Sequence, residues 1–173
     1  DKVIFDTSSI LILEFMIGEP YPFLSENYDK KNDILFFTFL SQGEEVIPKA
    51  LAFTPIEKHS TQYYNWGFGD LVISNQTGEY IIDDKIESNN GDIKTVFYTV
   101  VSTLTVFFGI HPDATVHVEG SNRQRMEIYR GLIRRHWWQI EPFYEIRGFS
   151  KDAIVPFEPG IEFEYILISR KKL

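Results

Sequence analysis

One stretch, residues 89–138, constrains the fold more than any other because it predicts a helix, a short strand and a second helix in succession. From Ile93 to Phe108 apolar residues recur at spacings of three and four, which is the period of an amphipathic helix. The segment is rich in Val and Thr, which favour strands, but strands usually end after about 4–8 residues. We therefore predict a central, mostly buried helix over residues 91–108. The candidate N-terminal caps are Asn89, Asn90 and Asp92.

A second helix is predicted over residues 121–138, after a short strand at 115–119. In the strand Val116 and Val118 alternate with His117, a pattern that buries at least one face. Ser121, followed three residues later by Gln124, matches a capping box and marks the start of the helix. The apolar face of this helix carries Met126, Tyr129, Leu132 and Ile133.

Arg125 is unusual among the five arginines of this helix, because a helical projection places it on the apolar side, beside Tyr129. A guanidinium cannot lose its charge, so burial requires an anionic or hydrogen-bonding companion. Two interpretations remain open. Arg125 either bonds Asp92, Glu119 or a loop carbonyl and locks the two helices together, or it stands at a cleft that receives an anion.

The second interpretation draws on the strand-to-helix turn, where free amides and the positive end of the helix dipole favour a phosphate or carboxylate. It predicts a small-anion site at residues 120–125, on a helix whose remaining arginines form exposed i,i+4 ion pairs. The predicted ligand-binding residues are Ser121, Asn122, Arg123, Arg125 and Tyr129.

Composition limits the function classes. The 173 residues fit a single domain, 1–173, and 43% of them are hydrophobic, enough for an ordered core. The absence of Cys excludes thiol nucleophiles and thiolate metal sites. A net charge of −8 argues against nucleic-acid binding and favours a small anionic ligand or a protein partner. We expect no membrane span and a cytoplasmic location, while a removed segment before Asp1 stays open.

No catalytic constellation stands out. The four histidines lack the spacing of a metal site, so neither a metal nor a cofactor is predicted. Asp92 and His117 are the candidate acid–base residues, and Asp70 is a further carboxylate near glycines that could serve as a base or pair with Arg125. A capping carboxylate and an ordinary strand histidine are the alternative interpretations, so whether the protein is an enzyme is left open.

The remaining segments predict strands. Residues 34–40 and 46–53 form a hairpin, 63–73 a strand with a bulge near Gly67 and Gly69, and 79–82 a short strand. Residues 10–17 favour a buried strand, and 20–29 a loop. Residues 139–148 predict an interrupted strand, and 153–157 with 161–168 a hairpin around Pro159-Gly160. The fold class is α/β (α+β), a mixed, mostly antiparallel sheet backed by two main helices.

Two resemblances follow from these residues. Residues 88–92 before the Val-rich helix, Phe68-Gly69-Asp70, and Gly120-Ser121 with Arg125 and Tyr129 resemble a small family of bacterial proteins of unknown function over most of the chain. The family implies no activity.

The order of elements, with Asn122 and Tyr129 near the start of the second helix, is similar to that of GNAT-superfamily acetyltransferases. In that superfamily an asparagine and a tyrosine of the penultimate helix lie close to the acyl-carrier cofactor. This chain departs from the pattern, because Ser88-Asn89-Asn90-Gly91-Asp92 replaces the glycine-rich pyrophosphate loop, which argues against coenzyme A as a cofactor.

The sequence thus favours a GNAT-like protein that binds a small anion or a protein partner, in the context of a bacterial toxin–antitoxin or defence pair. An active acyl- or nucleotidyl-transferase or hydrolase that uses the same pocket is the alternative. A toxin that acts on nucleic acid ranks last because of the overall charge.

Overall fold

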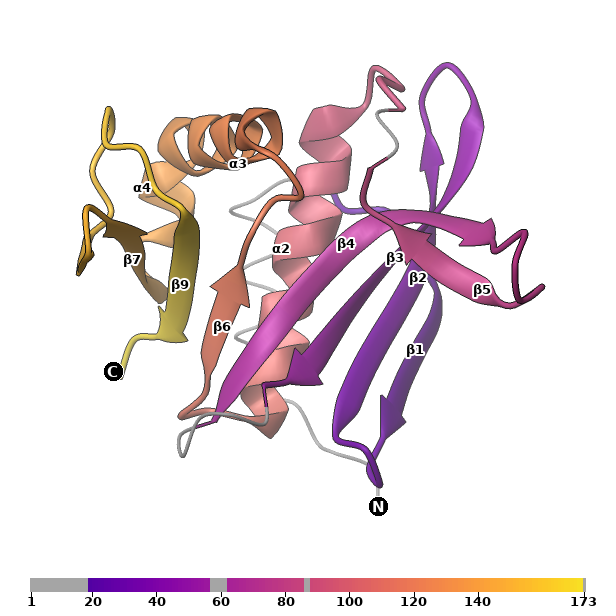
Figure 1. Cartoon of the computed structure of the whole chain (residues 1–173), viewed down its shortest axis with the longest axis horizontal. Helices are drawn as coiled ribbons and strands as arrows, with labels where there is room; N and C mark the ends of the chain where they lie inside the picture. The colour runs from indigo at the N-terminus through magenta and orange to yellow at the C-terminus, as the bar shows by residue number, and fades with distance from the viewer. Residues whose placement is uncertain (1–18, 57–61, 86–87, 173) are drawn as a thin grey trace.

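The computed structural model describes residues 19–56, 62–85 and 88–172. Within these ranges nine strands form one sheet, and three helices accompany it (Figure 1). The strands are β1 (Phe23–Asp29), β2 (Ile34–Gln42), β3 (Val46–Pro55), β4 (Tyr63–Ile73), β5 (Tyr80–Asp83), β6 (Thr115–Val118), β7 (Tyr144–Ser150), β8 (Ala153–Pro156) and β9 (Tyr165–Arg170). The helices are α2 (Ile93–Ile110), α3 (Arg123–Arg135) and α4 (Trp137–Ile140). The predicted segment 10–17 lies outside the described residues.

The strand order is β1-β2-β3-β4-β6-β9-β7-β8, with β5 paired to part of β4. Every pair is antiparallel except β4 with β6. The predicted fold class, a mixed and mostly antiparallel sheet with helices, is therefore confirmed.

The parallel pair is short and then opens. β4 and β6 pair only from Tyr63 to Asn65, opposite Thr115 to His117. Beyond this point β4 turns toward β5, with which it pairs through residues 70–73, while β6 ends at Val118. Figure 1 shows the two strands diverging toward α3, with α2 running behind them. The divergence leaves room between the sheet and the two helices.

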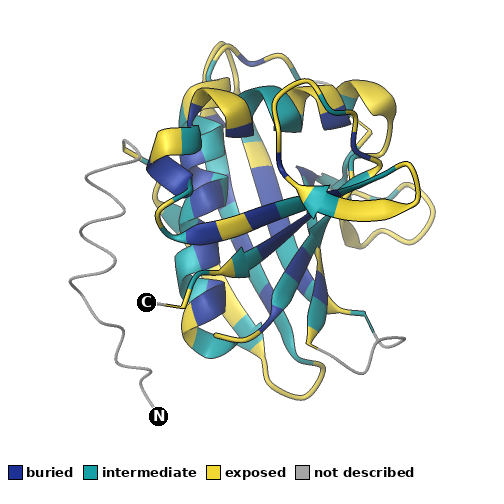
Figure 2. Ribbon diagram, turned by 90° about the vertical axis from the view of Figure 1, so that its left-hand side faces the viewer, coloured by how far each residue is buried: buried dark blue, intermediate teal, exposed yellow. Residues whose placement is uncertain are grey.

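The core lies between the sheet and α2. Alternate residues of β2 and β3 face the helix, because successive side chains of a strand point to opposite faces of the sheet. Figure 2 shows the resulting alternation of buried and more exposed positions along the strands. Phe107 of α2 stacks on Phe53 with ring centroids 4.3 Å apart, and both are fully buried. Helix α2 begins and ends two residues later than predicted. By length and composition it could span a membrane, and its buried residues pack in the core against the sheet.

Strand β4 is confirmed over residues 63–73, but the predicted bulge is wrong. Its register against β3 is unbroken from Lys49↔Asp70 to Pro55↔Tyr64. Gly69 serves close packing instead, because a Cβ there would lie 2.3 Å from the carbonyl oxygen of Asp83.

Three other local predictions are corrected. Residues 23–29 form edge strand β1 rather than a loop. Residues 137–140 form α4, so the segment predicted as one strand over 139–148 begins as a helix. β8 and β9 are not paired with each other, because each pairs with β7, and the hairpin is β7–β8. Lys151 and Asp152 both adopt positive φ at its turn, the conformation of a tight hairpin.

Candidate functional site

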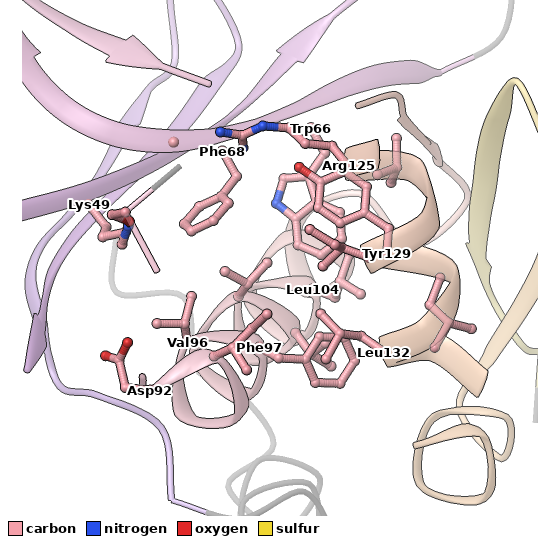
Figure 3. A pocket seen from close by; sticks show the side chains of 18 of the residues that line it. Lys49, Trp66, Phe68, Asp92, Val96, Phe97, Leu104, Arg125, Tyr129 and Leu132 are labelled. Carbon is pink, nitrogen blue, oxygen red and sulfur yellow. The ribbon is translucent and has the colours of Figure 1, made fainter. Parts of the chain in front are cut away.

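A cavity of about 550 Å³ opens between α2, α3 and the part of the sheet where β4 leaves β6. Figure 3 shows Trp66 and Phe68 of β4 facing Val96 and Leu104 of α2 across it. Helix α2 therefore buries one face on the sheet and turns a second, half-buried face to the cavity. The apolar part of the lining includes Trp66, Phe68, Val96, Phe97, Val100, Leu104, Ile128, Tyr129 and Leu132.

One end of the cavity is charged because the apolar face of the sheet ends there. Along β3 and β4 the cross-strand pairs facing the helix are Phe53↔Trp66, Leu51↔Phe68 and then Lys49↔Asp70. The Lys49 ammonium and the Asp70 carboxylate form an ion pair, and each side chain is only 8% exposed. Lys49 also donates a hydrogen bond to Ser88 Oγ at 2.6 Å.

Asp92 lies at the same charged end, just before α2. It occupies the cap position, but its side chain does not cap the helix, so the predicted capping role is wrong. Its Oδ2 instead accepts hydrogen bonds from Tyr21 Oη and Ser41 Oγ, both at 2.7 Å. Burial and the hydrogen bond to Asp92 raise the pKa of Tyr21, which keeps its hydroxyl a donor.

The loop that carries Ser88 and Asp92 is held by Asn90. The Asn90 amide donates to Ser41 Oγ and to the Glu45 carbonyl and accepts from Glu45 N–H, each at 2.8 Å. The Glu44 amide donates to the Asn90 carbonyl at 2.9 Å. The approach is so close that a Cβ at Gly43 would lie 1.7 Å from the Asn90 oxygen. The charged end of the cavity is therefore built on a fixed loop.

Arg125 and Tyr129 line the cavity from α3. Arg125 is half-buried, and in Figure 3 its guanidinium lies beside Trp66 and Phe68, at the opposite end of the cavity from Asp92. Asp92 is therefore not its companion, contrary to one of the partners predicted from the sequence.

The other predicted ligand-binding residues lie outside the cavity lining. Asn122, rather than Ser121, caps α3, and its Oδ1 accepts from the Arg125 amide at 2.9 Å, so the predicted capping box is wrong. Ser121 donates to the Asp84 carbonyl at 3.0 Å. Arg123, whose side chain is 75% exposed, pairs with Glu162 and Glu127. Arg125, Tyr129 and Asp92 thus line one cavity, whereas the contacts of Ser121, Asn122 and Arg123 hold the turn and the start of α3 in place.

His117 lies on the other face of the sheet. Val116 belongs to the core and Val118 lines the cavity, so the residue between them points away from both. Its ring packs against Tyr165 with centroids 4.6 Å apart and lies 3.9 Å from Glu119. This position does not bring His117 to the cavity with Asp92.

Lys49 and Ser88 were missed by the sequence analysis. Lys49 follows Pro48 in a strand whose later residues Leu51 and Phe53 share its parity, so strand alternation assigns it to the buried face. That signal identifies an inward lysine, although its partner Asp70 becomes evident only from the register of β3 and β4.

A separate polar cluster lies near the C-terminal end of α2. Tyr28 and Tyr64 donate to the two oxygens of Asp33 at 2.7 and 2.5 Å, and His111 Nε2 lies 3.1 Å from Asp33 Oδ1. Burial acts to raise the pKa of Asp33, but the two hydrogen bonds and His111 outweigh it and hold the pKa below its usual value. The hydrogen bond to Asp33 raises the pKa of Tyr28 to about 12. Among the described residues no group of His, Asp and Glu is arranged to hold a metal ion.

Comparison with known families gives one match. The model of a family of unknown function, DUF6934, matches residues 20–171. The chain belongs to this family. The match covers β1 through β9, so the cavity and every residue described above lie within it. Searches of curated proteins and of solved structures find no match.

Proposed function

We propose that the protein binds a small amphipathic molecule, with an apolar body in the cavity and an anionic group, a carboxylate or phosphate, at Arg125. The observation that carries this proposal is a largely apolar cavity of about 550 Å³ with a half-buried guanidinium in its wall. The volume lies within the range of about 300–1,000 Å³ typical of small-molecule sites.

In this proposal the apolar walls supply the binding affinity, and Arg125 supplies selectivity for an anionic group. The side chains of Val96, Phe97 and Val100 are held half-exposed around the cavity. An apolar ligand that covered them would be stabilised by about 25 cal/mol for each Å² of apolar surface removed from water. A guanidinium in such surroundings favours a carboxylate or phosphate, because its charge attracts an anion and its planar N–H groups match the geometry of the anion's oxygens. The anion is thus proposed to bind the Arg125 side chain, whereas the sequence-based prediction also involved the backbone amides of the turn before α3.

The proposal includes a GNAT-like architecture. The supporting features are one parallel strand pair, β4 with β6, that diverges, with α2 before β6 and α3 after it. The same divergence favours a second candidate function, an acyl transferase that takes a thioester at the opening. The 88–92 loop argues against it, because Asp92 stands where phosphate groups would bind.

Isothermal titration calorimetry with decanoate and decanol tests the first proposal. Decanoate is expected to bind the wild type, and Arg125→Gln is expected to weaken it about ten-fold, the cost of a charged hydrogen bond. Arg134→Gln, an exposed arginine of the same helix, is the matched control and is expected to change nothing.

The outcomes separate the candidates. Decanol binding as tightly as decanoate, or decanoate binding that is indifferent to Arg125→Gln, would contradict recognition of an anion. Saturable binding of acetyl-coenzyme A, with turnover that depends on Asp92, would favour the transferase instead.

A further inference from the structure

The charged end of the cavity has a chemistry of its own, distinct from that of Arg125. The side chains of Lys49 and Asp70 are each only 8% exposed, yet both line the cavity. A buried ion pair usually contributes little to stability, because taking two charges out of water costs about as much as their attraction returns. The position of this ion pair beside a cavity therefore points to a role in recognising a ligand.

This end has unused hydrogen-bonding capacity. An ammonium carries three N–H donors, and Asp70 and Ser88 accept two of those of Lys49. Within the described ranges the partner of Asp70 is Lys49 through Oδ1, and the partners of Asp92 are Tyr21 and Ser41 through Oδ2. Oxygen lone pairs of two carboxylates thus remain for a ligand.

The charges decide what kind of group fits. Among the described residues, two carboxylates, those of Asp70 and Asp92, and one ammonium, that of Lys49, line this end, so their charges sum to a negative value. It repels a second anion and favours a group that donates hydrogen bonds. The Arg125 guanidinium, elsewhere in the cavity wall, has the opposite preference.

We propose that the ligand is bifunctional. It carries an acidic group for Arg125 and, elsewhere on its apolar body, a hydrogen-bond donor such as a hydroxyl, an amide N–H or an ammonium, whose hydrogen bonds Asp70 and Asp92 accept. The Lys49 ammonium orients Asp70 and donates to any acceptor on the same group. This inference rests on the proposed function, because it takes the acidic group at Arg125 as given.

Calorimetric titration with matched probes tests the inference. Unbranched carboxylates from octanoate to dodecanoate are compared with their ω-hydroxy, ω-amino and ω-carboxy derivatives of equal length. At the best-fitting length an ω-donor is expected to bind about ten-fold more tightly than the plain carboxylate, and the dicarboxylate more weakly than the ω-hydroxy acid. The ω-amino and ω-hydroxy probes separate a cationic donor from a neutral one.

A double variant supplies the matched control. Lys49→Met/Asp70→Leu replaces the ion pair with apolar groups of similar size, so it keeps the fold without an unpaired charge. It is expected to lose the preference for the ω-donor, so that the plain carboxylate and its ω-donor derivative bind it with similar affinity. Arg125→Gln is expected to weaken both probes equally and keep the preference.

The result that would overturn this inference differs from the result that would overturn the proposed function. Equal affinity of the plain and ω-donor probes, or a preference that survives in the double variant, overturns the inference and leaves anion binding at Arg125 intact. Absence of binding by every carboxylate overturns the proposed function and this inference with it.

Discussion

Removal of one partner of the buried ion pair is expected to destabilise the fold strongly. Asp70→Asn keeps the shape of the side chain but leaves the Lys49 ammonium, only 8% exposed, without its counter-ion. Ser88 Oγ cannot neutralise that charge. Breaking a buried pair in this way costs about 3–5 kcal/mol. For a domain of this size each kcal/mol corresponds to about 2–4 °C in Tm, so the expected loss is about 6–20 °C.

The double variant Lys49→Met/Asp70→Leu is expected to recover most of that loss. Its new side chains would extend the apolar rows of Leu51 and Phe68, and no buried charge would remain. We expect its free energy of unfolding to lie within about 1 kcal/mol of the wild type. Urea unfolding at neutral pH, followed by tryptophan fluorescence, measures all three proteins. A double variant less stable than Asp70→Asn would refute this account, because the pair would then stabilise the fold in its own right.

Two further predictions concern the frame around the site. Gly43→Ala is expected to lower the free energy of unfolding by about 1–3 kcal/mol, because the new Cβ meets the Asn90 backbone. Gly131→Ala, in open space on α3, is expected to raise the free energy of unfolding by about 0.5–1 kcal/mol. Urea titration compares the two variants, and equal effects would contradict the close packing at Gly43. Since the pKa of Asp33 is held below its unfolded value, its contribution to stability is present above about pH 4 and is lost as pH falls through the folded pKa. Tm measured from neutral to acid pH is expected to fall less steeply in Asp33→Asn, and parallel curves would count against the cluster.

Elements with a strong local period could be predicted from the sequence. Helix α2 carries apolar residues at helical spacing over its whole length, and the strands β2 and β4 are rich in aromatic residues. The inward position of Arg125 also follows from local geometry, since the helical period alone puts it beside Tyr129. These features depend on residues a few positions apart, which a single sequence displays directly.

Features that depend on distant pairing could not be predicted in the same way. Strand β1 lies at the sheet edge with exposed residues such as Leu24, so it lacks the alternation of a buried strand. Pro159-Gly160 forms the predicted turn, but the strands on either side of it do not pair with each other, since β8 pairs with β7 and β9 with β6 and β7. Asp70 was recognised as a carboxylate near glycines, whereas its partner Lys49 follows only from the register of two strands.

Stability and binding of the same double variant together decide what the ion pair does. If Lys49→Met/Asp70→Leu is as stable as the wild type, the fold does not require the pair, and its presence at the cavity needs another physical reason. Selectivity for a hydrogen-bond donor supplies that reason only if the variant also loses the ω-donor preference. A stable variant with unchanged binding would leave the pair without a role in either stability or selectivity. A stable variant that still binds plain carboxylates but has lost the ω-donor preference would make Lys49 and Asp70 determinants of specificity. The affinity of the cavity would then come from its apolar walls and Arg125.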